Sequence, residues 1–350
     1  MRHLQFQGSH YEMGVRRGEI LRENKVTFSI HLDEFQMQHG KQSSEILRTV
    51  FPEVCGEVRG LTDTIDVDFQ TFLSWMLCMG CCMYNLAGNI PKEIRGCTAF
   101  AYSGNGQVIY GRNNDLPPWM REQSNSEVYD PEGGYRFQLT TSSFINGEEG
   151  INEHGLATAM TFVMTRLHKI RPGINSCFAV RYLLEKAKNT KEALTLLQNL
   201  PVASNYNLLI ADPGGDMAVV ECTPSGKRIR NAEPVQEGSL ICTVNSFTSE
   251  EMKAQDDSEG QDYRSRERYE VVRQSFAKRK DRTDVIGFAQ KLLRGEYGFL
   301  CQYDQEPDFE TIWSSVFDLK TRMIYRAEGD PRRHEFQMDS RLRELIEKKK

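Results

Sequence analysis

Residues 94–115 read IRGCTAFAYSGNGQVIYGRNND, and their pattern predicts two antiparallel strands joined by a tight turn. The run CTAFAYS (97–103) has the composition of a strand, and QVIYGRN (107–113) has that of its returning partner. Between them, SGNG (103–106) carries Asn-Gly, the dipeptide best suited to a type I′ hairpin turn. The hairpin brings the end of the second strand back beside the start of the first, so residues near 97 and near 112 are expected to be neighbours.

The rest of the chain alternates hairpin-joined strands with helices. Apolar residues recur at helical spacing through about residues 11–90, including one helical run over about 44–62. Further helices are expected at about 176–187, 191–200 and 283–293. This order predicts an α+β fold in which antiparallel sheets are covered by helices. We expect residues 1–96 to form a helical N-terminal segment and residues 97–350 a catalytic part, together one folded unit.

Composition argues against several classes of function. The 350 residues carry a formal net charge of -5 without a basic stripe, so nucleic-acid binding is not expected. No apolar run approaches the roughly 18 residues of a membrane span, and the N-terminus lacks the apolar region of a secretory signal. We therefore expect a cytoplasmic protein with no membrane partner, whose nine cysteines are reduced.

A thiol follows directly after glycine at Gly96-Cys97, where the strand-rich part of the chain begins. If this peptide bond is cut, Cys97 gains a free α-amine, whose pKa of about 7.7–8.0 lets it act as a general base near neutral pH. Nucleophile and base then belong to one residue, and no catalytic histidine, metal or redox cofactor is required. Gly96 has no Cβ, which leaves its carbonyl open to attack by the thiol.

The string GRNND ends the second strand and offers partners for the thiol. Arg112 is expected to lie near the sulfur and to favour the thiolate. Asp115 is expected to accept a hydrogen bond from the new α-amine, and Asn113 and Asn114 to donate to substrate oxygens. Each piece alone has a commoner structural explanation, because a strand cysteine is usually part of a core and such a polar string is usually an exposed turn.

Together these motifs resemble the acyl-coenzyme A:6-aminopenicillanic-acid acyltransferase family, a relative of the choloylglycine hydrolases and penicillin V acylases. The resemblance covers nearly the whole chain, through GSHYEMGVRRG (8–18), FPEVCGEVRGL (51–61), GCTAF (96–100), YGRNND (110–115), GINEHGLA (150–157), LLIADPGGDMAVVE (208–221), TVNSF (243–247), SRERY (265–269) and TIWSSVFD (311–318). It implies the four-layer αββα sandwich of N-terminal-nucleophile hydrolases and a linear amide C–N hydrolase or acyltransferase. Cys97 corresponds to the family nucleophile.

The resemblance also implies roles for other residues. Arg112 and Asp115 match the arginine and aspartate that flank the nucleophile. Asn245, in TVNSF, matches the asparagine that helps to bind the oxyanion, and donors of this kind stabilise a tetrahedral intermediate. Arg268, in SRERY, is the best match to a second arginine of the family, with Arg266 as the alternative.

One departure concerns the second oxyanion donor. Hydrolases of the bile-salt group carry an asparagine or tyrosine shortly beyond the NEHG-like motif, where this chain has Thr161 and Phe162. The donor is then expected from Thr98 or from the backbone beside the nucleophile. Candidates for the acyl pocket are the apolar residues that flank the strands of the site: Trp119, Phe144, Phe162 and Met164.

Cys78, Cys81 and Cys82 form a run that contains CxxC, for which zinc binding or redox chemistry is the functional interpretation. The sequence has no second CxxC and no paired-histidine motif, and the run is apolar, so we expect core thiols and predict no metal site. Two alternatives to an N-terminal nucleophile stay open. One is a papain-like protease that uses Cys97 and His154 in an uncut chain, and the other is an inactive scaffold or binding protein that has kept the fold.

The sequence therefore predicts a precursor that cuts itself between Gly96 and Cys97. The two fragments are expected to stay associated, because the N-terminal helices carry apolar faces that need the rest of the chain for burial. The substrate is expected to be a small or non-peptide linear amide. Neither its identity nor the formation of a homo-oligomer follows from the sequence.

Overall fold

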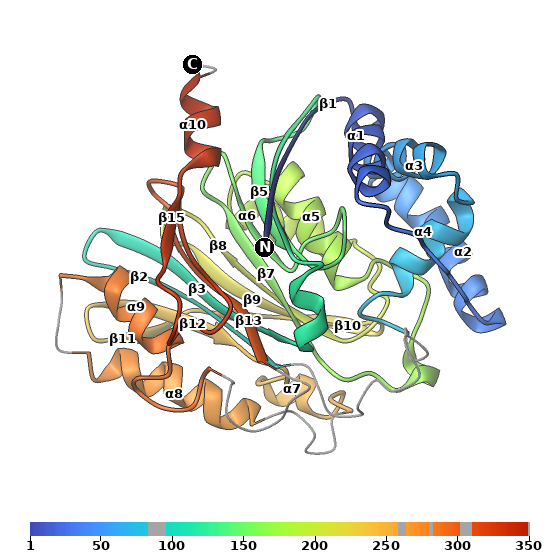
Figure 1. The fold of residues 1–350 in the computed structure, drawn as a ribbon. Helices are drawn as coiled ribbons and strands as arrows, with labels where there is room; N and C mark the ends of the chain where they lie inside the picture. Colours follow the sequence, from blue (N-terminus) through green and yellow to red (C-terminus); the bar gives the residue numbers. More distant parts are fainter. Residues whose placement is uncertain (83–95, 258–263, 280–282, 302–309, 349–350) are drawn as a thin grey trace.

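The computed structural model describes residues 1–82, 96–257, 264–279, 283–301 and 310–348. Within them, two sheets lie face to face (Figure 1). The first sheet has eight strands, in the order β1-β4-β5-β6-β7-β8-β9-β10, and the second has seven, in the order β11-β12-β2-β3-β13-β14-β15. Paired strands are antiparallel in both sheets except for the parallel pair β1 and β4.

The strands of the first sheet are β1 (Arg2–Gly8), β4 (Asn125–Pro131), β5 (Phe137–Thr141), β6 (Glu149–Asn152), β7 (Ala157–Phe162), β8 (Tyr206–Ala211), β9 (Met217–Thr223) and β10 (Gly226–Asn231). Those of the second sheet are β2 (Gly96–Gly104), β3 (Gln107–Leu116), β11 (Glu233–Val235), β12 (Gly238–Thr243), β13 (Glu310–Asp318), β14 (Met323–Glu328) and β15 (Gln337–Asp339). The helices are α1 (His10–Glu23), α2 (Glu34–Val50), α3 (Pro52–Ile65), α4 (Phe69–Cys78), α5 (Ser176–Lys186), α6 (Thr190–Gln198), α7 (Glu250–Lys253), α8 (Ser265–Ala277), α9 (Val285–Leu293) and α10 (Arg341–Lys348), with short 3-10 turns η1 (Pro118–Arg121) and η2 (Leu167–Lys169).

The layers follow from which side chains are buried together. Ala99 and Tyr110 of the second sheet share one apolar cluster with Ala159 and Leu209 of the first, so the two sheets bury their inner faces against each other. Helices α1 to α6 supply the apolar cover of the first sheet, and α8 and α9 cover the second. The predicted α+β fold of helix-covered antiparallel sheets is confirmed. No helix in the described ranges is both long enough and apolar enough to cross a bilayer.

The hairpin predicted around residues 103–106 is present as β2 and β3. Asn105 and Gly106 have φ angles of +52° and +77°, the two positive values that a type I′ turn requires. The register pairs Gly96 with Asp115 and Cys97 with Asn114. The hairpin therefore sets the start of β2 beside the end of β3, as the sequence predicts.

The N-terminal part differs from its prediction in two places. The expected single helix over 44–62 is wrong, because α2 ends before Phe51 and α3 begins at Pro52. Proline has no N–H and tolerates only the first turn of a helix, so it starts a new one here. Strand β1 was not predicted, since Phe6 is its only fully buried apolar side chain and the strand has little alternation to detect. Residues 83–95, which the helical prediction also covered, lie outside the described residues.

Helices α1 and α3 cross at a very short separation, which two glycines permit. A Cβ on Gly60 would lie 2.1 Å from the carbonyl oxygen of Tyr11, and one on Gly14 would lie 1.9 Å from that of Glu57. Real Cβ atoms do not approach backbone oxygens so closely, so any side chain at either position pushes the helices apart.

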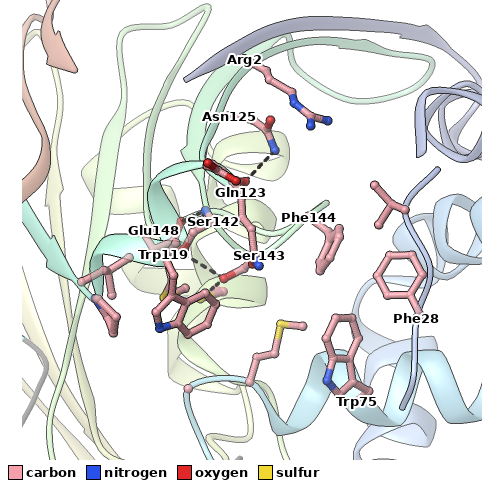
Figure 2. A pocket seen from close by; sticks show the side chains of 18 of the residues that line it. Arg2, Phe28, Trp75, Trp119, Gln123, Asn125, Ser142, Ser143, Phe144 and Glu148 are labelled. Carbon is pink, nitrogen blue, oxygen red and sulfur yellow. Dashed lines mark hydrogen bonds between the residues drawn. The ribbon is translucent and has the colours of Figure 1, made fainter. Parts of the chain in front are cut away.

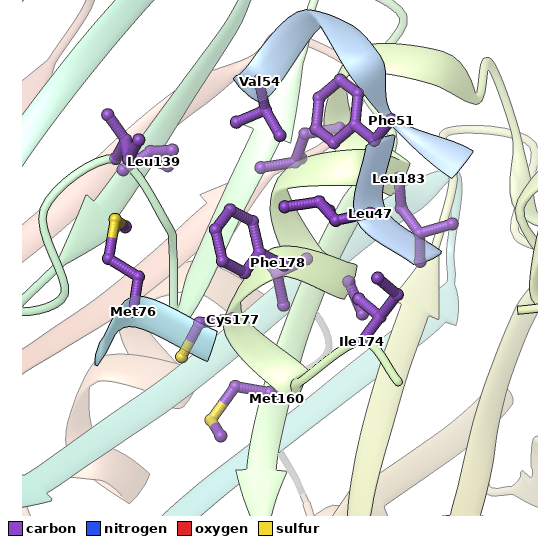
Figure 3. Close-up of a cluster of buried hydrophobic side chains, with 14 of the residues drawn as sticks. Leu47, Phe51, Val54, Met76, Leu139, Met160, Ile174, Cys177, Phe178 and Leu183 are labelled. Atoms are coloured by element: carbon purple, nitrogen blue, oxygen red, sulfur yellow. The ribbon is translucent and has the colours of Figure 1, made fainter. Parts of the chain in front are cut away.

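The core beneath the first sheet joins the N-terminal helices to α5. Figure 3 shows Leu47, Phe51 and Val54 on α2, α3 and the link between them, with Phe178 and Leu183 on the neighbouring α5. All five side chains are at most 1% exposed. Apolar burial of this kind is the main favourable term in association, so residues 1–82 are built into the same core as the rest of the molecule.

Buried ion pairs cross the same boundary. The guanidinium of Arg17 on α1 donates to both carboxylate oxygens of Glu127 on β4, at 2.9 and 2.5 Å. Arg181 on α5 donates to Glu57 on α3 at 2.8 Å. All four side chains are buried, so each charge depends on its partner.

Candidate active site

Cys97 lies near the start of β2 and forms part of the wall of a cavity of about 670 Å³. Its side chain is only 4% exposed. The cavity lies between the sheets and the N-terminal helices, with wall residues from β1, α1, α4, β3 and β7. The thiol therefore lies at a partly open cavity large enough for a small molecule.

Two side chains of β3 lie beside the thiol, and strand geometry explains which ones. Alternate residues of a strand face opposite sides of the sheet, so Arg112 and Asn114 share a face. Arg112 Nη2 donates to Cys97 Sγ at 3.3 Å. Asn114 Oδ1 accepts from Arg112 Nε at 3.2 Å and from the thiol at 3.4 Å. Asn114 Nδ2 is buried and has no hydrogen-bond partner within the described part of the chain.

The backbone of Cys97, like its side chain, is fixed by hydrogen bonds. Its N–H donates to Asn245 Oδ1 at 2.6 Å, and its carbonyl accepts from Arg268 Nη1 at 2.6 Å. Arg268 also donates to Thr98 Oγ1 at 2.9 Å and to Asn245 Oδ1 at 3.0 Å. Of the two arginines left open by the sequence, Arg268 is buried against the site and Arg266 is exposed.

Asn245 is placed by the segment that follows β12. Its second amide atom, Nδ2, donates to the carbonyl of Phe162 at 3.0 Å. In the intact chain, then, Asn245 binds the backbone nitrogen of Cys97 through its oxygen and the end of β7 through its nitrogen. The sequence predicted that Asp115 accepts from the α-amine freed by cleavage. In the uncut chain that nitrogen is bonded to Asn245, and the contact with Asp115 after cleavage stays a prediction.

Asp115 follows Asn114 and faces the other side of the sheet. Its Oδ1 accepts from Thr311 Oγ1 at 2.5 Å, and Oδ2 is buried with no hydrogen-bond partner among the described residues. Burial raises the pKa of Asp115 to about 7, although Arg268, the bond from Thr311 and Arg112 all act to lower it. Near neutral pH this carboxyl is poised between its two protonation states.

Burial also shifts the pKa of the Cys97 thiol. The pKa lies above the ordinary value for cysteine, because a buried thiolate loses its hydration. The Arg112 cation opposes this rise, as do the N–H of Asp115 and the more distant Arg268. The arginine thus offsets part of the effect of burial, and the pKa of the Cys97 thiol remains above its ordinary value.

Aromatic side chains form one wall of the cavity (Figure 2). The rings of Phe28, Trp75 and Phe144 lie 5.4 to 5.8 Å apart. Phe162 also lines the cavity, and Trp119 lies at its edge with 56% of its surface exposed. Trp119, Phe144 and Phe162 therefore all line the cavity beside Cys97, and their role in binding an acyl group stays a prediction.

A polar turn faces the aromatic wall. Glu148 accepts hydrogen bonds from the N–H of Ser142 at 3.0 Å and from the hydroxyls of Ser142 and Ser143 at 2.7 and 2.8 Å (Figure 2). Arg2 and Asn125 also line the cavity. These residues, like Phe28 and Trp75, were missed by sequence reasoning, because they are distant from the nucleophile in the chain and no motif marks them.

Three other residues considered from the sequence lie elsewhere. Asn113 faces away from the thiol, where Nδ2 donates to the carbonyls of Leu293 and Leu300 at 3.0 Å each, so its predicted contact with substrate is wrong. Met164 is not among the described residues that line the cavity. His154 packs its ring on Tyr135 at 4.5 Å, before the end of β7 opposite to the one near the thiol. This placement argues against a papain-like pair with the nucleophile.

Comparison with known proteins identifies the family. The family model for acyl-coenzyme A:6-aminopenicillanic acid acyl-transferase matches residues 102–333, about two thirds of the chain. The chain belongs to this family. The family resemblance predicted from the sequence is thereby confirmed. No curated protein matches the chain.

Solved structures of two related kinds are similar to the acyl-transferase family member described here. A penicillin V acylase from Agrobacterium tumefaciens is 21% identical, with 66% of this chain and 83% of that chain covered at a TM-score of 0.43. A point mutant of conjugated bile acid hydrolase from Clostridium perfringens is 14% identical, with 69% and 91% covered at a TM-score of 0.45.

Proposed function

We propose that this chain is a self-processing cysteine enzyme that hydrolyses or transfers the acyl group of linear amides through an acyl-enzyme on Cys97. One observation carries the proposal: the backbone nitrogen of Cys97 is bonded to Asn245, while its thiol contacts Arg112 at the cavity wall. No histidine is among the described residues that line this cavity. The base must then come from elsewhere, and an α-amine freed at Cys97 supplies it in the right place.

Maturation is a local reaction of one peptide bond. The thiol attacks the carbonyl carbon of Gly96, the C–N bond to Cys97 breaks, and the nitrogen takes up a proton as a thioester forms. Water then hydrolyses the thioester, giving the carboxylate of Gly96 and the free thiol. Asn245 retains the new amine, because its oxygen already accepts from that nitrogen at 2.6 Å.

In the mature enzyme the same thiol attacks the substrate amide. The amine of Cys97 accepts the thiol proton and passes it to the leaving nitrogen, so nitrogen leaves protonated and the acyl group stays on sulfur. We assign the oxyanion contact to Asn114 Nδ2, the buried donor without a partner in the described chain. Because Asn114 Oδ1 is held by Arg112, its nitrogen is oriented before the substrate arrives.

The cavity favours an apolar or aromatic acyl group. Phe28, Trp75 and Phe144 form a continuous ring surface at one wall, and Met79 and Leu21 also line the space. Aromatic walls of this kind bind flat or extended apolar groups by burial and ring contacts. Hydrolysis and acyl transfer share the thioester and differ only in whether water or an amine reaches it.

Intact mass spectrometry of the denatured protein tests the proposal. We expect two fragments, 1–96 and 97–350, with the second beginning at Cys97. Cys97→Ala is expected to give one uncut chain without amidase activity, whereas Cys55→Ala, which removes a buried thiol from α3, is expected to cut normally. A panel of N-acyl amides with aromatic and aliphatic acyl groups, assayed with and without an amine acceptor, separates hydrolysis from transfer. An uncut wild-type chain without activity would support the inactive-scaffold alternative instead.

A further inference from the structure

We propose that His39, Cys81 and Cys82 form a binding site for a thiolate-preferring divalent metal ion of the zinc class. This site is separate from the cysteine nucleophile and takes no part in the proposed acyl transfer. It uses the CxxC run for which the sequence predicted only core thiols. The inference stands on geometry that brings a histidine from another helix to these thiols.

The backbone after α4 folds into a tight turn that gathers the cysteines. The N–H groups of Cys81 and Cys82 both donate to the carbonyl of Cys78, at 3.0 and 2.9 Å. Gly80 has a φ of +64°, a left-handed conformation that glycine adopts without cost. The chain thus turns back on itself within three residues, which keeps the sulfurs of Cys81 and Cys82 close to each other and leaves Cys78 on the same turn.

Helix α2 closes the site from the opposite side. Gln36 Nε2 donates to the carbonyl of Cys82 at 2.8 Å, and the thiol of Cys78 donates to the carbonyl of Gln36 at 3.5 Å. One turn further along α2, His39 Nε2 lies 3.8 Å from Cys81 Sγ. His39, Cys78 and Cys82 are all buried, so the imidazole and thiols are held among fixed neighbours.

The spacing of the ligand atoms fits one ion. One ring nitrogen of His39 and the sulfurs of Cys81 and Cys82 all lie within 4.8 Å of one another. Zinc binds sulfur at about 2.3 Å and nitrogen at about 2.0–2.1 Å, so in a tetrahedral site its ligand atoms lie about 3.5–3.8 Å apart. The 3.8 Å between His39 Nε2 and Cys81 Sγ is already close to this range, and the other separations need to contract by at most about 1 Å. Cys78 lies on the same turn and would supply a third sulfur, the fourth ligand of a tetrahedral set, if its thiol turned away from the carbonyl of Gln36.

The chemistry of the ligands selects the class of metal. Thiolates and imidazole prefer zinc and related soft or borderline ions, whereas magnesium and calcium prefer oxygen. An apolar shell surrounds the group, since Leu32, Trp75 and Ile170 pack on these cysteines. Such a shell keeps water away from the thiolates and favours a permanent ion over an exchangeable one.

The site stands directly behind the aromatic wall of the cavity. Trp75 packs on the cysteine cluster and also lines the cavity, and Met79 and Gly80, within the metal-binding turn, line it as well. A bound ion would therefore fix the turn and with it this wall. Metal binding is expected to raise the thermal stability of the protein as well as to order the cavity.

Cobalt(II) and zinc(II) titrations of the full-length Cys97→Ala chain test the site. This background removes the nucleophilic thiol as a competing ligand and keeps the chain in one piece, so the result does not depend on self-cleavage. Under reducing conditions we expect one cobalt ion per chain, with the thiolate-to-cobalt charge-transfer absorption of a tetrahedral sulfur site, and displacement of that cobalt by zinc. Zinc is also expected to raise Tm.

Matched variants assign the ligands. Cys82→Ser and His39→Gln are each expected to lose the tetrahedral cobalt spectrum and the rise in Tm, while Cys55→Ser is expected to keep both. Circular dichroism checks that each variant folds, and Cys81→Ser serves if one of the first two does not. The proposal is overturned if the parent binds no cobalt, if the ligand variants bind it unchanged, or if the freshly purified protein contains a disulfide among Cys78, Cys81 and Cys82.

Discussion

Asn113 and Asn114 are adjacent in the sequence, but their side chains face opposite sides of β3. Asn114 faces Cys97, and its amide is oriented by Arg112, whereas Asn113 fixes two carbonyls at the end of α9 and beyond it. Strand alternation makes this division inevitable once one of the pair faces the thiol. The sequence predicted both as substrate donors because neither face of β3 could be assigned without the second sheet and the helices in place.

This pair gives a direct test of the oxyanion assignment. Asn114→Ala is expected to lower kcat about 10²–10³-fold with little change in KM, because a donor to the oxyanion acts mainly in the transition state. Asn113→Ala is expected to lower the free energy of unfolding by about 1–3 kcal/mol, since the carbonyls of Leu293 and Leu300 lose their donor, and to leave kcat nearly unchanged. Steady-state kinetics and urea unfolding of both variants test these two expectations. A normal kcat for Asn114→Ala would mean that a group other than Asn114 binds the oxyanion.

Asp115 predicts a dependence of stability on pH. Its pKa is about 7 in the folded protein because of burial, and about 3.9 in an unfolded chain. Between these values the folded state binds a proton that the unfolded state has released. The contribution of Asp115 to stability is therefore complete below about pH 4 and is lost as pH rises to about 7, by up to about 4 kcal/mol.

Asp115→Asn removes this titration while keeping an acceptor for Thr311. In the uncut Cys97→Ala chain, we expect the variant to be more stable than its parent at pH 8 and to lose less stability between pH 5 and pH 8. Urea unfolding at both pH values measures this. An unchanged pH dependence would mean that Asp115 stays ionised in the folded protein.

At the scale of the elements, local signals were sufficient for β2 and β3 and insufficient for β1. The Asn-Gly turn and the alternating strands fix the hairpin from adjacent residues alone. Strand β1 instead forms by parallel pairing with β4, more than a hundred residues later, and its own side chains are mostly polar. Local sequence patterns also gave no indication that His39 lies beside the cysteine turn. His39 approaches Cys81 because α2 packs on α4, and this contact joins residues that are far apart in the sequence.

The crossing of α1 and α3 predicts opposite effects for two glycines one turn apart. Gly60→Ala would place a methyl group 2.1 Å from the carbonyl oxygen of Tyr11, so the helices must separate. We expect a loss of about 1–3 kcal/mol in the free energy of unfolding, as for other overpacked cores. At Gly56 the nearest atom to a new Cβ lies at 3.7 Å, an ordinary contact.

Gly56→Ala is therefore the matched control. Alanine favours the helix over glycine by up to about 1 kcal/mol, so this variant is expected to be as stable as its parent or slightly more stable. Thermal and urea unfolding of both variants test the pair. Equal destabilisation would show that α3 tolerates no added methyl group on this face. It would contradict the inference that Gly60 is required because α1 lies so close to it.

At the scale of the whole molecule, cleavage at Gly96 would leave two chains that share one core. Strand β1 completes one edge of the first sheet, and the apolar faces of α2 and α3 are buried with α5 (Figure 3). The sequence predicted that the apolar faces would hold the fragments together. It gave no sign of the ion pairs, since Arg17 and Glu127 are 110 residues apart and charged residues are rarely buried without a partner.

Two ion pairs between α3 and α5 differ in burial, so removing each of them is expected to weaken the association of the fragments to a different extent. Glu57 and Arg181 are fully buried, whereas Glu53 is 39% exposed and Lys186 is 23% exposed. Glu57→Ala leaves the buried guanidinium of Arg181 with Glu185, at 3.2 Å, as its remaining carboxylate partner among the described residues, and we expect a loss of about 1–3 kcal/mol in the free energy of unfolding. Glu53→Ala removes a pair that water screens, and the expected loss is at most about 1 kcal/mol.

Both variants are measured by urea unfolding of the uncut Cys97→Ala chain and, where the wild-type background cuts itself, by size-exclusion chromatography of the fragments in increasing urea. Glu57→Ala is expected to release fragment 1–96 at a lower urea concentration than Glu53→Ala. Equal release by the two variants would mean that apolar burial alone joins the fragments, because a buried guanidinium that loses one of its two carboxylate partners is expected to weaken the interface more than the loss of an exposed pair does.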